Sequence, residues 1–226
     1  MLRSLMILTV ALVPPTVAAE PRVQVLETGL LAERDVPRDA EGRWWALCTD
    51  GGRDALVPVE VGVEWERSSE PGEGRRARVE ARGCKQVVVL VRGLGEARTR
   101  ALPVARHRTV MEERGSGERG EDLVRRVEEV LFGEQRFRLQ TSRWSWGEGP
   151  ELRAWSGRSS WLGQHLHPEA DWALRWAGDL DGDGRLDLVV EEERPGRAPR
   201  VHLFLSGAAE ERELVGEVDA PPLEGR

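Results

Sequence analysis

The sequence predicts a mainly β protein built from antiparallel sheets, sandwich-like or barrel-like, with at most one short helix. Three observations support this fold class. Apolar and polar residues alternate at a period of two in several short segments. The 25 Gly and 13 Pro supply turn residues between those segments. The hydrophobic content of 39% is that of an ordinary globular chain, which excludes wholesale disorder.

The first half of the chain contains most of the strand signals. Residues 23–31 begin with alternation, residues 44–48 read WWALC, and residues 78–83 read RVEARG. Residues 55–65 place their valines on one face, and Pro58 predicts an edge position or an irregular start there. Residues 86–91 read QVVVLV, which is typical of a strand buried on both faces.

The second half begins with an expected break. Residues 112–121 read EERGSGERGE, which indicates an exposed linker or long loop and a possible sub-boundary. In residues 122–133 the apolar positions fit one face of a helix, with Gly133 at its C-cap. Strand character resumes at residues 137–140 and 172–176, and residues 186–191 and 201–205 predict a hairpin, so that the whole unit covers residues 172–205.

The amino terminus reads as a secretory signal peptide. Arg3 precedes an apolar run over residues 5–13, and Val17-Ala18-Ala19 offers small residues for cleavage. The alternative is a buried N-terminal strand, but Pro14-Pro15 follows the run directly. We therefore expect residues 1–19 to be removed and residues 20–226 to form an exported β-rich domain, secreted or periplasmic, without a later membrane span.

Cys48 and Cys84 are the two cysteines of the chain. An exported protein folds in an oxidising compartment, which favours a disulfide between them. The alternative is a pair of separate buried thiols. A metal site is disfavoured because neither cysteine has a second cysteine or a histidine at ligand spacing.

Charge and motif content narrow the function classes. A net charge of −7 and a pI near 5.4 argue against a nucleic-acid partner, because phosphate binding needs a basic surface. The P-loop, the dinucleotide fingerprint and Gly-x-Ser-x-Gly are absent from the sequence. Its 40 acidic residues offer many pairs for glycoside hydrolysis, but no pair is singled out.

The strongest signal is the acidic segment WAGDLDGDGRLDLVVEEE, residues 176–193. A tight loop around an ion directs alternate residues inward, so odd spacing brings carboxylates together, while glycines permit the sharp turn. Oxygen ligands in a flexible loop suit Ca²⁺ better than Zn²⁺ or Mg²⁺. A solvated acidic turn without metal is the alternative. The predicted ligands are Asp179, Asp181, Asp183, Arg185 through its carbonyl, and Asp187.

The pattern Asp-x-Asp-x-Asp-Gly-x-x-Asp followed by an apolar strand resembles the FG-GAP or VCBS-type calcium-loop repeat of integrin-like proteins. An EF-hand fits less well, because position twelve is Val190 and the following segment is β-like. The resemblance implies a calcium loop joining two antiparallel strands. The motif occurs once, so a complete β-propeller is not expected. The layout also resembles small secreted bacterial proteins with one such loop.

Two weaker signals remain open. His165-x-His167 followed by Glu169 could ligate a transition metal but is better explained as a plain loop, and His107 and His202 are isolated in the sequence. Glu191 to Glu193 reads as a solvated hairpin end. Four tryptophans in a Gly- and Ser-rich stretch could either fill the core or form a platform on which sugars stack. They are Trp144, Trp146, Trp155 and Trp161.

These features together predict an exported, calcium-binding, non-catalytic structural or interaction protein of the bacterial cell envelope. Its partner would be another envelope protein or a glycan. The alternative is a carbohydrate-binding module that uses the tryptophan-rich stretch over residues 144–161. A hydrolase is the third and weakest interpretation.

Overall fold

The structure is a computed structural model that describes residues 23–50, 53–67, 74–95, 99–114, 123–144, 147–167, 170–195 and 197–218. The side chains of residues 111–125 and 143–147 also lie outside the description. In the described ranges the elements are strands and two short 3₁₀ turns, and all strand pairs are antiparallel. The predicted mainly β fold is therefore confirmed. No described helix has the length and hydropathy to cross a membrane. The predicted signal peptide lies outside the described residues.

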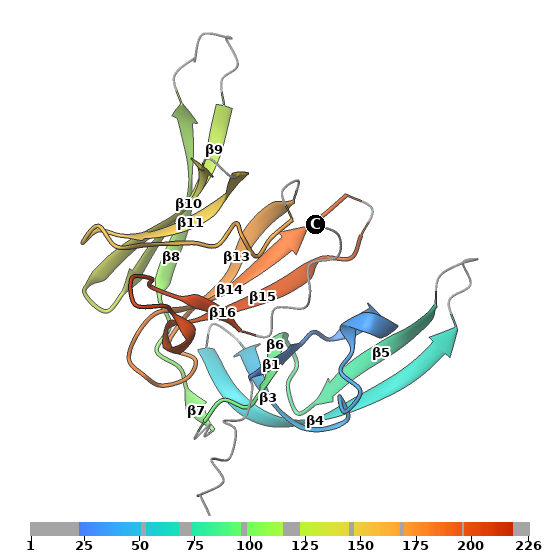
Figure 1. The fold of residues 1–226 in the computed structure, drawn as a ribbon. Coiled ribbons are helices and arrows are strands. Elements are labelled where there is room, and N and C mark those ends of the chain that lie inside the picture. Colours follow the sequence, from blue (N-terminus) through green and yellow to red (C-terminus); the bar gives the residue numbers. More distant parts are fainter. Residues whose placement is uncertain are drawn as a thin grey trace, which may run out of the picture.

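Three sheets make up the described fold (Figure 1). The N-terminal sheet has seven strands and curls into a half-barrel, with β1, β6, β3, β4, β5 and β2 in spatial order and β7 paired to β4. Its strands are β1 (Gln24–Leu26), β2 (Gly29–Ala32), β3 (Gly42–Asp50), β4 (Arg53–Arg67), β5 (Arg75–Arg82), β6 (Val87–Arg92) and β7 (Arg100–Ala101), and a 3₁₀ turn, η1 (Glu33–Asp35), follows β2.

The other two sheets are simple meanders in which neighbours in sequence are neighbours in space. The five-stranded sheet contains β8 (Arg106–Arg114), β9 (Leu123–Phe132), β10 (Gln135–Trp144), β11 (Gly147–Ala154) and β12 (Ser159–Trp161). The four-stranded sheet contains β13 (Asp171–Gly178), β14 (Asp187–Glu193), β15 (Arg200–Leu205) and β16 (Gly216–Val218), with a 3₁₀ turn, η2 (Ser206–Ala208), after β15.

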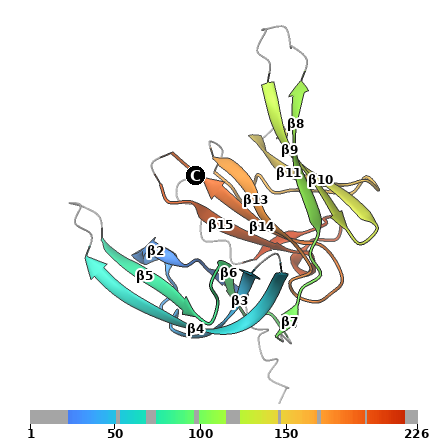
Figure 2. The same ribbon diagram turned by 180° about the vertical axis from the view of Figure 1, so that it is seen from behind.

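The four-stranded sheet is the central layer, between the half-barrel and the five-stranded sheet (Figure 2). Its middle strands, β14 and β15, are largely buried on both faces, because successive side chains point to opposite sides of a strand and another sheet covers each side. Leu188 and Val190 of β14 join a core cluster with Leu139 and Leu152 of the five-stranded sheet. Val189, between them, joins a second cluster with residues of β3, β4 and β6. A third cluster fills the inside of the half-barrel.

The helix predicted over residues 122–133 is wrong. Leu123–Phe132 is strand β9, which pairs with β8 on one side and with β10 on the other. Its valines are β-branched, and hydrogen bonding along both edges outweighs the helical spacing of the apolar residues. Gly133 has a φ of 58° and lies in the tight turn before Gln135, not at a helix end.

Pro58 lies inside strand β4, where it pairs with Trp45 of β3. On its other edge β4 changes partner at this point, because residues 55–56 pair with β7 and residues 60–67 pair with β5. The missing N–H of Pro58 therefore falls where that edge has no strand partner.

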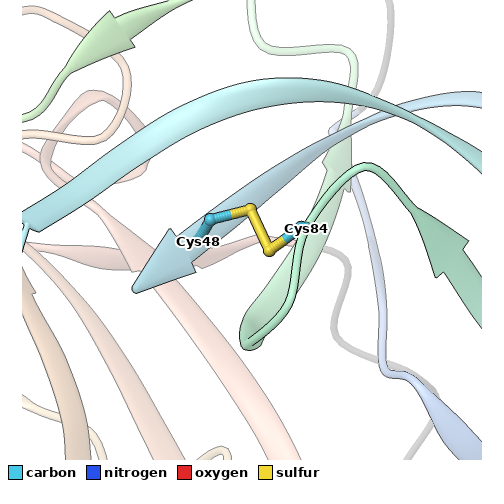
Figure 3. Close-up of a disulfide and its surroundings, with 2 residues drawn as sticks. All are labelled: Cys48 and Cys84. Carbon is cyan, nitrogen blue, oxygen red and sulfur yellow. A yellow bond between two sulfur atoms is a disulfide. The ribbon is translucent and has the colours of Figure 1, made fainter. Parts of the chain in front are cut away.

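The predicted disulfide between Cys48 and Cys84 is confirmed (Figure 3). Cys48 is in β3, and Cys84 lies in the connection from β5 to β6. The bond closes a loop with a sequence separation of 36 residues and fastens the middle of the half-barrel.

Removing the disulfide with the double substitution Cys48→Ala and Cys84→Ala should lower the free energy of unfolding by about 3–4 kcal/mol, since the bond restricts the unfolded chain. Urea unfolding followed by tryptophan fluorescence measures this. In reductant, the wild-type protein should unfold at the same urea concentration as the double variant. Reductant should not change the unfolding midpoint of the double variant itself. A midpoint that does not move would contradict the stabilising role.

Candidate metal centre

The acidic loop joins β13 to β14, as the sequence predicts. Gly178 and Asp187 pair across the neck of the loop. Leu180 is fully buried in the cluster shared with the half-barrel, and Leu186 is buried in the cluster shared with the five-stranded sheet. Two apolar residues therefore fasten the loop on opposite sides, and this leaves the polar residues between them to form the tip.

Three carboxylates converge in this loop. Asp179, Asp181 and Asp187 each offer an oxygen within 4.8 Å of the others, and this group could hold a metal ion. Asp179 is 5% exposed and Asp187 is fully buried, whereas Asp181 is half-buried. Among the described residues no other group of histidine, cysteine or acidic side chains converges in this way.

Backbone N–H groups hold the two buried carboxylates in place. Asp187 Oδ2 accepts hydrogen bonds from Leu180 N at 2.7 Å and Asp181 N at 3.4 Å. Its Oδ1 accepts one from Ser206 N, at the start of η2, at 2.8 Å. Asp179 accepts from Gly182 N at 2.5 Å and from Gly184 N at 3.1 Å. The loop is preorganised because these bonds fix the carboxylate positions.

The electrostatics of the triad call for a positive partner. Burial, reinforced by the charge of Asp181, raises the pKa of Asp187 to about 7. Burial also raises the pKa of Asp181, and the neighbouring Asp183 and Asp179 add to the rise. Several negative charges are thus unfavourable together here unless a proton or a cation neutralises them.

The structure places the other two predicted ligands differently. Asp183 Oδ2 accepts hydrogen bonds from Arg185 Nε at 2.8 Å and Ser206 Oγ at 2.7 Å, so this carboxylate belongs to the loop but not to the converging triad. Burial alone would raise the pKa of Asp183, but these bonds lower it. Arg185 donates its backbone N–H to Asp183 Oδ1 at 2.8 Å. A metal role for Asp183 or for the Arg185 carbonyl stays a prediction.

Both glycines of the loop have a left-handed backbone, with φ of 90° at Gly182 and 79° at Gly184. They differ in their surroundings. A Cβ on Gly182 would lie 2.3 Å from Nη1 of Arg100, whereas a Cβ on Gly184 would meet nothing within 4 Å. Arg100 comes from β7 of the half-barrel, and its Nη2 donates to Leu180 O at 2.9 Å.

The chain that leads out of the half-barrel runs alongside the entry to the loop. Asp179 N donates to Pro103 O at 2.9 Å, and Ala105 N donates to Ala177 O at 2.9 Å. Trp176 Nε1 donates to Asp54 Oδ2 of β4 at 3.0 Å. The acidic loop is therefore bonded to the half-barrel as well as to its own sheet, which the sequence does not reveal because these partners are far apart along the chain.

One sequence interpretation near this sheet is wrong. His202, isolated in the sequence, is buried in β15 between Glu192 and Glu217. Glu192 is 2% exposed, not part of a solvated hairpin end, because β14 is covered on both faces. His165 contacts Glu217, and His167 donates its backbone N–H to Glu192 Oε1 at 3.2 Å. Glu169 lies outside the described residues, so the structure does not show a third ligand for the possible metal site at His165 and His167.

The described part of the tryptophan-rich stretch belongs to the five-stranded sheet. Trp155, just after β11, is 82% exposed. Trp161 of β12 is half-buried and packs against Gly163 and Gly149. Trp144 ends β10, but its side chain lies outside the description, as does Trp146 entirely. The stretch therefore contains at least one exposed and one packed tryptophan.

Comparisons with protein-family models, with curated proteins and with solved structures found no match. The resemblance of the acidic loop to the FG-GAP or VCBS-type repeat stays a prediction that depends on the loop residues alone.

Gly182→Ala and Gly184→Ala form a matched pair that tests the packing of Arg100 on the loop. Both should lose about 1 kcal/mol of unfolding free energy from the left-handed backbone. Gly182→Ala should lose about 1 kcal/mol more, because the new methyl displaces Arg100 from Leu180 O. In an Arg100→Ala background this excess should vanish, as chemical unfolding of all the variants would show. Equal losses for the two single variants would contradict the contact.

Proposed function

We propose that this protein is an exported, calcium-binding, non-catalytic structural or interaction protein of the bacterial cell envelope. The observation that carries the proposal is the convergence of Asp179, Asp181 and Asp187 at the junction of two central strands. The ion would replace the proton that this group otherwise needs, and it would fix the turn between β13 and β14.

The donor set favours calcium among the common ions. All three side chains offer carboxylate oxygens, which are hard ligands, and no histidine or cysteine joins the group. Glycines at 182 and 184 let the loop adjust to the larger and less regular coordination shell of Ca²⁺. Mg²⁺ demands a stricter octahedron and keeps more of its water.

The surroundings of the triad favour a structural role for the ion. Asp187 is fully buried, and its oxygens accept three backbone N–H groups. Such a carboxylate is poorly placed to contact a substrate, but well placed to join β13, β14 and η2. The ion would bind the folded chain and not the unfolded one, so it would stabilise the fold by mass action.

Calcium should raise the unfolding free energy of EDTA-treated mature protein by about 2.7 kcal/mol at a free concentration one hundred times the dissociation constant. Calorimetry should find one site, with weaker binding of Mg²⁺. Asp181→Asn should abolish the heat of binding, because it removes one negative charge from the triad. Asp183→Asn should weaken calcium binding if Asp183 is a further ligand, as the sequence predicts.

Asp171→Asn is the matched control, since Asp171 is an exposed aspartate at the start of the same strand, β13. It should bind calcium as the wild type does. Identical melting curves in Ca²⁺ and in EDTA would contradict a structural role of the ion. Tighter binding of Zn²⁺ than of Ca²⁺ would refute the choice of metal.

The exposure of Trp155 supports a second candidate, a carbohydrate-binding module. The indole of Trp155 is 82% exposed, and a flat aromatic face suits stacking on a sugar ring. Trp155 is held in a turn, where its backbone N–H donates to Arg136 O at 3.0 Å. Its ring is thus presented from a fixed backbone.

Titration with envelope glycans should quench tryptophan fluorescence in the wild type, and Trp155→Ala should lose the response if this candidate is correct. Trp65→Ala is the control, because Trp65 is 39% exposed in the half-barrel, where Arg75 lies over its ring at 4.8 Å. Quenching that survives Trp155→Ala, or no quenching at all, would reject Trp155 as the binding residue.

A further inference from the structure

A row of ionisable side chains crosses three strands of the four-stranded sheet. Glu192 of β14, His202 of β15 and Glu217 of β16 have side chains 2–3% exposed. His202 Nε2 lies 2.7 Å from Glu192 Oε2, and His202 Nδ1 lies 2.6 Å from Glu217 Oε1. Phe204 stacks beside the imidazole, with ring centroids 6.4 Å apart. These groups are thus sequestered from water and contact one another directly.

The contacts of the two ring nitrogens bear on how many protons the imidazole of His202 carries. A neutral imidazole has one N–H, so one of its nitrogens would direct a lone pair at a carboxylate oxygen. Both nitrogens of His202 face carboxylate oxygens, and an imidazolium lets both of them donate while Glu192 and Glu217 stay ionised. The two nitrogens point to opposite sides of the ring, so they cannot bind one metal ion together. Among the described residues, Glu192, His202 and Glu217 do not form a converging group of possible metal ligands.

His165 completes the row from the connection between β12 and β13. Its Nδ1 lies 2.6 Å from Glu217 Oε2. The side-chain amide nitrogen of Gln164 lies 2.9 Å from His165 Nε2. His202 is the ring that lies between the two glutamates.

We propose that His202 is a pH-sensitive latch for the C-terminal strand: as an imidazolium it fastens β16 to the four-stranded sheet, and on losing its proton it releases β16. Three residues form this strand, which pairs with β15 alone among the described strands, so the backbone hydrogen bonds described for it are few. Glu217 is its middle residue and its link to the buried charges. Without the imidazolium, Glu217 would be a carboxylate facing Glu192 across a neutral ring.

The charged neighbours set the direction of the response. Arg194 Nε lies 2.9 Å from Glu192 Oε1, so cations and anions alternate along the row. Glu27, which follows β1, accepts a hydrogen bond from Val201 N, and its charge also acts on His202. The titratable and charged groups around the latch are Glu192, Arg194, Glu217, His165, Glu27, Arg200 and Glu191.

The pKa directions agree with the geometry. Burial alone would lower the pKa of His202, but Glu192 and Glu217 outweigh it and raise the pKa above 6.5. Burial alone would raise the pKa of both glutamates, but their bonded histidines lower it below 4.5. The latch stabilisation from His202 is complete below pH 6.5 and is lost as pH rises through the raised pKa. The part from the glutamates is complete above pH 4.5 and is lost in acid.

Release would reach the acidic loop through η2. A Cβ on Gly216 would lie 2.2 Å from Ala208 O, so β16 packs directly on this turn. Ser206, at the start of the turn, donates from N to Asp187 and from Oγ to Asp183. The latch thus supports the segment that covers the loop, but it neither contains a predicted metal ligand nor depends on bound calcium.

Hydrogen exchange of the full mature protein in EDTA tests the latch. Between pH 6 and pH 9, after correction for intrinsic exchange, β16 should lose protection as His202 loses its proton, while β14 should not. His202→Gln should remove the pH dependence. His107→Gln should keep it, because His107 is 38% exposed in the five-stranded sheet. Protection of β16 that is independent of pH in the wild type would overturn the proposal, as would unchanged pH dependence in His202→Gln.

A titration of the wild-type histidines by nitrogen chemical shift keeps the test decisive if His202→Gln does not fold. At pH 6 both ring nitrogens of His202 should be protonated, and the midpoint should lie above 6.5. A single protonated ring nitrogen at pH 6, or a midpoint at or below 6.5, would refute the latch.

Discussion

The burial of the four-stranded sheet on both faces is the constraint on which the rest of the described structure depends. Side chains of β14 alternate between a core shared with the five-stranded sheet and a core shared with the half-barrel. This sheet therefore joins the described fold together, and removing it from either core would expose a large apolar surface to water. A charged side chain that is buried in this sheet must be neutralised in place, because water cannot reach it.

Two buried clusters of charged side chains belong to this sheet, and each is neutralised by a different kind of partner. At the neck of the acidic loop, three carboxylates converge on one point, which suits a cation. In the middle of the sheet, two carboxylates flank one imidazole, which suits a proton. The turn η2 touches the loop and leads to β16, so both groups help to hold the C-terminal segment.

The sequence predicted many of the strands and the acidic loop, but it indicated a helix at β9, did not predict β8 or β11, and placed residues 112–114, which end β8, in a linker whose residues 115–121 lie outside the described residues. Segments such as residues 86–91 and 186–191 combine β-branched residues with short length, and both form strands. In residues 122–133 the apolar spacing suits a helix as well as a strand. Pairing of β9 with neighbours on both edges settled the choice, and those partners are not visible in a local pattern.

The sequence by itself determined the mainly β class, the pairing of its two cysteines and the position of the acidic loop, because each depends on local spacing or on a single possible partner. Only the tertiary structure decided that Asp183 turns to Ser206, that Arg100 packs on Gly182, and that His202 lies between two glutamates. These contacts join residues distant along the chain. The stacking of the sheets determines which of these distant residues meet. Burial then removes water from the charged side chains, so that their partners determine their protonation and their contribution to stability.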